Sequence, residues 1–155
     1  MDIQIKNDAS ELIYSEQMDF PLPKFLSPSL IEEKQQFNYH FADASFQEIY
    51  FDGYHIAIGD VHVHENLHIY TSEHIPTISL IFMLNGQFAT GPDLLTGNFG
   101  KRRYQSREHN LFFNPSPAEN IDVDKQRGFE LMALAFSTDR FLDIAANGGR
   151  VLDNL

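Results

Sequence analysis

Residues 46–58, Phe46-Gln47-Glu48-Ile49-Tyr50-Phe51-Asp52-Gly53-Tyr54-His55-Ile56-Ala57-Ile58, contain the pattern that decides the fold. Apolar and polar side chains alternate on both sides of Asp52-Gly53, as they do in strands that bury one face. Asp-Gly is typical of a two-residue type I′ turn, because both central residues of that turn need a positive φ. The stretch therefore predicts a β-hairpin and the start of a β-domain.

Short alternating stretches continue after this hairpin and are separated by Gly, Pro and Asn. They predict strands near 61–72, 76–84, 87–91, 98–105, 110–114, 119–124 and 128–137. Many short strands at regular intervals imply a sandwich or a barrel. Ser137 or Thr138 can then cap a helix, which Asn147-Gly148-Gly149 would end. We therefore expect one all-β domain that is closed by a C-terminal α-helix.

Residues 1–45 are less regular than the rest of the chain. Three prolines interrupt this segment, and Ser29-Leu30-Ile31-Glu32 has the spacing of a capping box. The pattern predicts an irregular N-terminal arm with one short helix near 30–37. The candidate anchors that would hold such an arm over the mouth of a barrel are Phe20, Phe25 and Phe37.

Charge and composition exclude several classes of function. The chain of 155 residues has 22 acidic and 11 basic residues, so its formal net charge is −11. Such a surface repels phosphate backbones and anionic membranes, and the chain alone should not bind DNA. Because the chain has no cysteine, it has no disulfide, thiolate zinc site or cysteine nucleophile. Without a signal peptide or a long apolar run, we expect a cytoplasmic protein with no membrane contact.

Histidines are concentrated in one part of the sequence, where they suggest a metal site. Five of the seven histidines lie within twenty residues: His55, His62, His64, His68 and His74. His62 and His64 form an H-x-H pair, and residues two apart in a strand project from the same face. A catalytic zinc or iron site needs a third protein ligand. The alternative is that His62 and His64 are ordinary histidines on the polar face of a strand.

The order of an irregular arm, a β-barrel and a terminal helix resembles the amino-terminal effector domain of AraC-type transcriptional regulators. The resemblance covers about residues 46–146 and is carried by four stretches: His68-Ile69-Tyr70; Glu73-His74-x-Pro76-x-x-Ser79-x-x-Phe82-x-Leu84-x-Gly86; His109-Asn110-Leu111-Phe112-Phe113-x-Pro115; and Phe129-Glu130 through Phe136-Ser137 into Arg140-Phe141-Leu142-x-Ile144-Ala145.

The resemblance implies a fold, a division of the chain and a role. It implies a cupin-like jelly-roll barrel over 46–137, after an arm over 1–45 and before a helix and linker over 138–155. It further implies an effector-sensing domain that binds a small molecule without catalysis and without a cofactor. DNA would be bound only by a C-terminal helix-turn-helix domain that this sequence lacks. The terminal helix could pair with that of a second copy in a homodimer, or pack on its own barrel.

Metal-binding cupins provide a test of the histidine cluster. With the conserved glycine of their first motif aligned at Gly86, the expected histidine and glutamate positions fall on Ser72, His74 and Ser79. With the second motif aligned at Pro115, the last histidine position falls on Asn120. His74 alone matches among these four ligand positions. We therefore expect no functional metal; if one were bound, its ligands would come from His62, His64 and His74.

The resemblance places His68 and Tyr70 near the effector pocket, and both side chains can hydrogen-bond a polar molecule. Arg103, within Lys101-Arg102-Arg103, could meet an anionic effector, although a solvated hairpin face is the alternative for this basic stretch. His109 and Asn110 are expected to shape a turn.

Two other functions stay open: a stand-alone metal-dependent cupin enzyme, such as an isomerase or dioxygenase, and a sugar- or lectin-like binding module.

Overall fold

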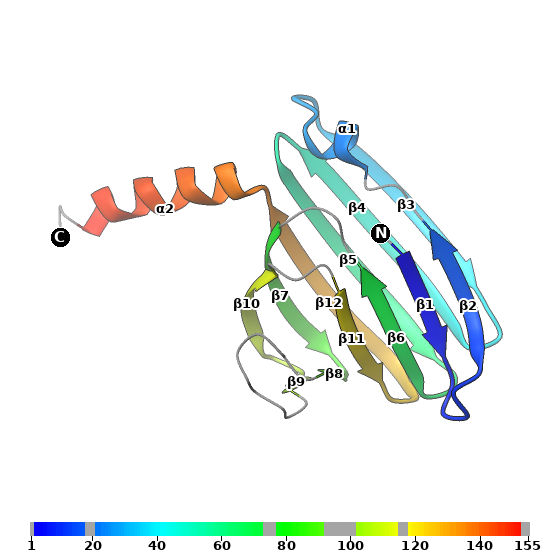
Figure 1. Ribbon diagram of the computed structural model, residues 1–155. Coiled ribbons are helices and arrows are strands. Elements are labelled where there is room, and N and C mark those ends of the chain that lie inside the picture. The colour runs from blue at the N-terminus through cyan, green and yellow to red at the C-terminus, as the bar shows by residue number, and fades with distance from the viewer. Residues whose placement is uncertain (1, 18–20, 73–76, 92–101, 115–117, 153–155) are drawn as a thin grey trace.

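Two six-stranded antiparallel sheets face each other in the computed structural model, which describes residues 2–17, 21–72, 77–91, 102–114 and 118–152. In Figure 1 the sheet with β1, β6 and β11 lies in front of the sheet with β4, β5 and β12. Sheet A has the order β2 (Leu12–Gln17), β1 (Asp2–Lys6), β6 (Leu67–Ser72), β11 (Ala118–Val123), β8 (Gln87–Thr90) and β9 (Arg102–Gln105). Sheet B has the order β10 (His109–Asn114), β7 (Thr77–Asn85), β12 (Gln126–Phe136), β5 (Tyr54–Val63), β4 (Ala42–Phe51) and β3 (Ile31–Asn38).

The strand order is that of a jelly roll. β12 lies between β5 and β7 in sheet B, and β6 pairs with β11 in sheet A. The chain thus crosses from one sheet to the other between β5 and β6, between β6 and β7, and between β11 and β12. Such interleaving of two antiparallel sheets defines the jelly-roll class, to which cupins belong. The prediction of an all-β, cupin-like fold with a C-terminal helix is confirmed.

The predicted hairpin at Asp52-Gly53 is present and connects β4 to β5. Both turn residues have positive φ, at 45° for Asp52 and 83° for Gly53. Phe51 pairs with Tyr54, and Tyr50 pairs with His55, so the turn sets the register of the two strands. This turn marks one end of the sandwich, which we call the hairpin end.

The core lies between the two sheets and is built from alternate residues of the strands. Its buried members include Val63, Leu67, Met83, Val123 and Phe129. Phe46 lies over Gly59, where an added Cβ would come within 2.6 Å of the ring. The hydrophobic contribution of such a core amounts to roughly 1.5 to 3 kcal/mol for each fully buried aliphatic or aromatic side chain.

The N-terminal segment differs from the sequence-based prediction. The prediction of a helix near 30–37 is wrong, because Ile31–Asn38 is strand β3 and pairs with β4. Half-buried Ile31 and Glu33 alternate with exposed Glu32 and Lys34, which is the period of a strand. The segment has its short helix earlier, in α1 (Leu22–Phe25), while β1 and β2 belong to sheet A. Of the proposed anchors, Phe25 is buried and Phe37 is half-buried, and Phe20 lies outside the described residues.

The terminal helix begins where the sequence indicated but is longer than predicted. α2 spans Thr138–Leu152, and the backbone NH of Arg140 donates to Ser137 Oγ at 3.3 Å in a capping contact. The helix continues through Asn147-Gly148-Gly149, so the predicted stop is wrong. In Figure 1, α2 projects away from the two sheets. Within the described residues, no helix has the length and apolar character needed to cross a membrane.

Candidate functional site

His68 and Tyr70 share one face of β6, as their spacing predicted. Leu67 and Ile69, which alternate with them, take part in the core, so His68 and Tyr70 lie on the outer face of sheet A. Tyr70 is 38% exposed. The two side chains therefore project away from the space between the sheets. Their binding of an effector stays a prediction.

Two carboxylates hold the imidazole of His68. Nδ1 lies 2.6 Å from Asp122 Oδ1, and Nε2 lies 3.2 Å from Asp8 Oδ1 in the turn between β1 and β2. The hydrogen bond to Asp122, followed by the one to Asp8, raises the pKa of His68. Because both ring nitrogens are already bonded, a ligand would have to displace a carboxylate to bond this ring.

Arg103 lies near His68, although the two are far apart in sequence. Both line a hollow of about 110 Å³ whose wall also includes Asp8, Asp122 and Asp124. Arg103 lies 3.9 Å from Asp124 and hydrogen-bonds Gln87 at 3.3 Å. Two of the three predicted ligand-binding residues thus meet in one hollow, at the end of the sandwich opposite the hairpin end.

The histidines of the H-x-H pair lie at the end of β5. Their rings are 5.0 Å apart, and His64 Nε2 lies 3.0 Å from Asp43 Oδ2. His74 lies outside the described residues. Across the described ranges, no group of three or more His, Asp or Glu side chains is placed to hold a metal ion. Two positions aligned with cupin ligands, Ser79 and Asn120, belong to different sheets.

His109 lies on a strand rather than in a turn, and Arg102 lies on a strand, as the stretch 98–105 predicted. His109 begins β10, where its ring stacks on Phe82 with centroids 6.0 Å apart. The guanidinium carbon of Arg102 lies 5.3 Å from the centroid of the Tyr104 ring. The turn predicted at His109 and Asn110 is therefore wrong, because both residues belong to β10 and pair with β7.

A polar cluster that sequence analysis missed lies on the inner face of sheet B, close to the hairpin end. Glu48 and Tyr50 from β4 and His55 from β5 are its centre. His55 Nε2 lies 3.2 Å from Glu48 Oε1, and the rings of Tyr50 and His55 stack in parallel with centroids 4.4 Å apart. Tyr50 is 4% exposed. The side chains of Glu48 and His55 keep 19% and 24% of their surface exposed, so solvent reaches them.

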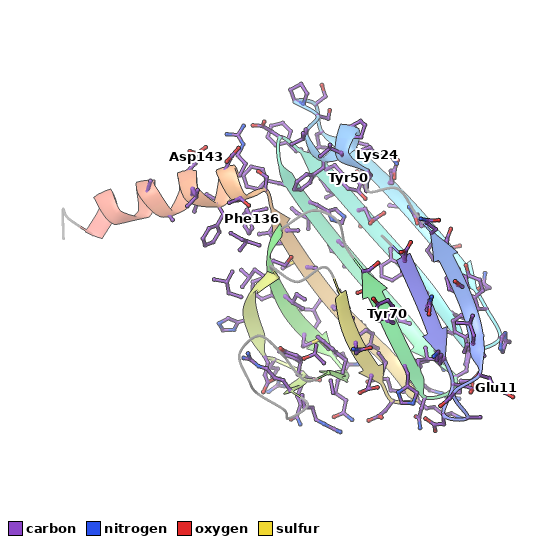
Figure 2. All side chains as sticks on the ribbon, in the orientation of Figure 1. Glu11, Lys24, Tyr50, Tyr70, Phe136 and Asp143 are labelled. Carbon is purple, nitrogen blue, oxygen red and sulfur yellow. The ribbon has the colours of Figure 1, made fainter. Side chains whose placement is uncertain are left out.

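An ion pair extends the cluster toward the N-terminal segment. Lys24 Nζ in α1 donates to both carboxylate oxygens of Glu33 in β3, at 2.6 and 2.8 Å. We call Lys24, Glu33, Glu48, Tyr50 and His55 the end cluster. Figure 2 labels Lys24 and Tyr50 at the same end of the molecule as Phe136 and Asp143, which flank the start of α2. Glu11 marks the opposite end.

The charges of the end cluster reinforce one another. The hydrogen bond from His55 lowers the pKa of Glu48, and the charge of Lys24 acts in the same direction while burial opposes it. Burial, followed by the negative charge of Glu48, raises the pKa of Tyr50. At neutral pH the cluster therefore holds an ionised Glu48 and a neutral Tyr50 hydroxyl, which donates to Glu48.

The hairpin turn connects the end cluster to both α1 and α2. Backbone NH groups of Asp52 and Gly53 donate to Ser27 and Phe25, both at 2.7 Å, and the NH of Ser137 donates to Gly53 O at 2.9 Å. Arg140 donates from Nε to Asp52 O at 2.8 Å and forms an ion pair with the Asp52 carboxylate. An added Cβ on Gly53 would lie 2.8 Å from Ser137 Oγ. The turn is thus packed directly against the start of α2.

The pairing of Tyr50 with His55 followed from the predicted hairpin register, but the inward direction of these side chains did not. A strand pattern tells which residues share a face, and burial of that face depends on the second sheet. Chemically, the end cluster offers an ionised carboxylate, an imidazole, a phenol and an ammonium group within one small region. Such a set binds polar molecules through both donors and acceptors.

No protein-family profile matches the chain, and no curated protein sequence matches it. Among solved structures, the chain is similar to an RmlC-like cupin from Shewanella frigidimarina, with 9% identity and a TM-score of 0.45 over 81% of this chain and 96% of that one. It is also similar to a cupin-superfamily sugar phosphate isomerase from Silicibacter pomeroyi, with 9% identity and a TM-score of 0.44 over 61% of this chain and 60% of that one. A third similar structure is an HTH_3 family transcriptional regulator from Vibrio cholerae, with 14% identity and a TM-score of 0.41 over 60% of this chain and 50% of that one. These similarities concern the fold, and the activities in the names of these proteins are properties of those proteins.

Proposed function

We propose that this chain is an effector-sensing regulatory domain of the kind found in AraC-type transcription regulators, and that it binds a small molecule at the end cluster without catalysis. The sequence resemblance over residues 46–146 supports the regulatory role. The position of the end cluster beside both the N-terminal segment and the terminal helix supports the place of binding.

One observation carries this proposal: the hairpin turn that follows Tyr50 is bonded to α1 on one side and to α2 on the other. The turn is two residues from Tyr50 along β4, and Arg140 of α2 bonds both its backbone and its side chain. A molecule that moves Tyr50 or His55 therefore acts on the residues that hold α2. A regulator needs this kind of connection between its ligand and the segment that leads out of the domain.

The mechanism would be linkage between two arrangements of α1, the hairpin turn and α2. A ligand shifts this equilibrium by the difference between its affinities for the two arrangements. Coupling free energies of this kind are typically about 1 to 3 kcal/mol. No covalent step is required.

The charges of the end cluster favour one class of ligand. Two carboxylates, Glu33 and Glu48, outnumber the one ammonium group, and the chain carries a net charge of −11. An anionic ligand would be repelled, whereas hydroxyl groups and amines can bond carboxylates and imidazole. We therefore propose a small neutral polyhydroxylated molecule or a small amine.

Calorimetric titration with pentoses, hexoses, inositols and primary amines tests the binding site. We expect at least one of these probes to bind, and His55→Ala and Glu48→Gln to weaken its affinity at least about tenfold. His68→Ala and Arg103→Ala are the matched control, since they remove polar groups at the opposite end of the sandwich. Binding that is lost in the control and kept in His55→Ala would move the site to the hollow with His68. Failure of every probe to bind would contradict the proposed ligand class.

Elemental analysis of the same protein tests the absence of catalysis by a bound metal. A stoichiometric transition metal that is lost in His62→Ala, His64→Ala would contradict the sensing role and support the alternative of a metal-dependent cupin enzyme.

A further inference from the structure

A second hollow, larger than the one with His68, lies on the outer face of sheet B. Val61 and Val63 of β5 belong to the core, so Ile58 and Asp60, which alternate with them, lie on the opposite face of the sheet. The hollow has a volume of about 290 Å³. Its wall is formed by residues 34–36 of β3, 45–47 of β4 and 58–60 of β5, together with Leu84 and Glu130. We call it the sheet B hollow.

Two aliphatic side chains line the sheet B hollow and remain accessible to solvent. Ile58 is 40% exposed and Leu84 is 51% exposed. Leu84 is an extra residue in β7, since its neighbours on either side pair with consecutive residues of β12. A β-bulge of this kind changes the direction of a side chain and is common beside binding sites. The hollow therefore offers an apolar surface to a small hydrocarbon group.

Two carboxylates lie side by side at one wall of the sheet B hollow. Asp60 of β5 and Glu130 of β12 are directly opposite each other in the sheet, and both are exposed. Like charges in this arrangement repel each other and destabilise a sheet. Among the described residues, neither side chain has a hydrogen-bond or ion-pair partner. The pair therefore favours a cation, and an ammonium group has enough N–H donors to bond both carboxylates.

An ammonium group lies on the other side of the same hollow. Lys34 of β3 is exposed, and in the part of the chain that the structure describes its side chain forms no ion pair or hydrogen bond. Lys34 is opposite Gln47, which is opposite Ile58, so two strand spacings separate it from β5. These spacings place the Cα atoms of Lys34 and Asp60 about 12 Å apart. The two side chains can span this separation with one small molecule between them.

We propose that the sheet B hollow binds a free amino acid with an apolar side chain. The α-ammonium group of the ligand donates to Asp60 and Glu130, and its carboxylate accepts from Lys34. The apolar side chain of the ligand covers Ile58 and Leu84. Small-molecule sites begin at about 300 Å³, so a hollow of about 290 Å³ suits a ligand of this size. Neither a simple amine nor a simple carboxylate meets both kinds of charge. This site is separate from the end cluster and does not depend on the proposed function.

Nuclear magnetic resonance titration of the isotope-labelled full chain with leucine locates the site. We expect amide shifts at residues 45, 58–60 and 130, with a dissociation constant in about the millimolar range because exposed ion pairs are weak. Glycine, which lacks the apolar side chain, should bind more weakly. His55→Ala changes the end cluster and should leave leucine binding unchanged, so the two proposed sites can fail separately. Absence of shifts, or shifts confined to the surroundings of His55, would overturn the proposal.

Two analogues of leucine assign each charge of the ligand to its partner. Leucinol lacks the carboxylate and isocaproate lacks the ammonium group, so each should bind about two- to fivefold more weakly than leucine. Lys34→Gln should remove the preference for leucine over leucinol. Asp60→Asn with Glu130→Gln should remove the preference for leucine over isocaproate, and it should fold like the wild type because it relieves a repulsion.

Asp124→Asn is the matched control for these charge variants. Asp124 is an exposed carboxylate at the hollow with His68, so its removal changes the net charge by the same step at a different place. Both preferences should persist in this variant. Preferences that survive in the Lys34 and Asp60 variants, or that disappear in Asp124→Asn, would contradict binding at the sheet B hollow.

Discussion

His68 lies between two aspartates, and this position determines what its imidazole does. In the sequence, His68 and Tyr70 share a face of one strand, and the structure confirms that they do. The period of a strand could not tell that this face is the outer one, because that depends on how sheet A packs on sheet B. The partners of His68 come from Asp8 and Asp122, 60 and 54 residues away. Such distant contacts leave no pattern in the sequence.

The raised pKa of His68 predicts a particular dependence of stability on pH. A histidine whose pKa is higher in the folded protein stabilises it fully below the unfolded value, and this stabilisation is lost as the pH rises through the folded value. The free energy of unfolding of the wild type should therefore exceed that of His68→Gln by up to about 1 kcal/mol in mildly acidic solution. Above the folded pKa this excess should shrink. Urea unfolding over a pH series measures the difference.

Asp122→Asn provides the matched variant for this experiment, because it leaves the histidine and removes its first carboxylate. Asp122→Asn should reduce the pH dependence of the free energy of unfolding more than Asp8→Asn does, since the hydrogen bond to Asp122 is the larger cause of the raised pKa of His68. A difference between wild type and His68→Gln that stays constant across the pH series would contradict this explanation.

Gly53 illustrates how one residue serves both the hairpin and the helix. Its φ of 83° favours glycine, and a Cβ would lie 2.8 Å from both Ser137 Oγ and Arg140 Cγ. Gly53→Ala should therefore lower the free energy of unfolding by about 1 to 3 kcal/mol. Gly128→Ala is the matched control, with a φ of 68° but a Cβ that would meet the Asn85 amide at 3.0 Å. Chemical denaturation should show the larger loss for Gly53→Ala, and an equal loss would argue against a close contact with α2.

Among the elements, the hairpin and most later strands could be predicted because they alternate with period two. The start of α2 could be predicted from its capping residues and apolar spacing. Strand β3 could not be predicted in this way. The capping-box spacing of Ser29–Glu32 favoured a helix, and the alternation that follows it is too short to outweigh that signal. The segment forms a strand because β4 provides the partner with which it pairs. The inner position of Glu48 and His55 likewise depends on the pairing of whole sheets.

Arg140 is the residue that holds the first turn of α2 on the hairpin turn. It bonds the carbonyl oxygen of Asp52 and pairs with its carboxylate, and Asp143 lies 3.5 Å away in the next turn. Arg140→Ala should raise amide exchange in residues 138–141 by up to about fivefold, which corresponds to an exposed ion pair worth up to about 1 kcal/mol. Asp52→Asn keeps the backbone carbonyl that accepts from Arg140 Nε, so it should raise amide exchange less than Arg140→Ala does. Unchanged exchange in Arg140→Ala would contradict a connection through this residue.

For the molecule as a whole, the two ends of the sandwich have different chemistry. The hairpin end holds the end cluster, α1 and the start of α2, and the opposite end holds the hollow with His68 and Arg103. The sequence resemblance predicted both a jelly-roll barrel and a terminal helix, and both are present. It did not predict which end of the barrel lies beside that helix. A ligand bound at the end cluster, as we propose, would therefore lie at the same end of the sandwich as the start of α2.

Hydrogen exchange with and without a bound probe tests the central claim most directly. The wild-type chain, saturated with whichever sugar or amine binds in calorimetry, would be compared with the free chain. A coupling of about 1 kcal/mol or more should change exchange about fivefold at the amides of residues 52–53 and 138–141. Exchange near His68 should change less. A bound probe that leaves residues 138–141 unchanged would contradict the claim that the end cluster senses an effector for α2.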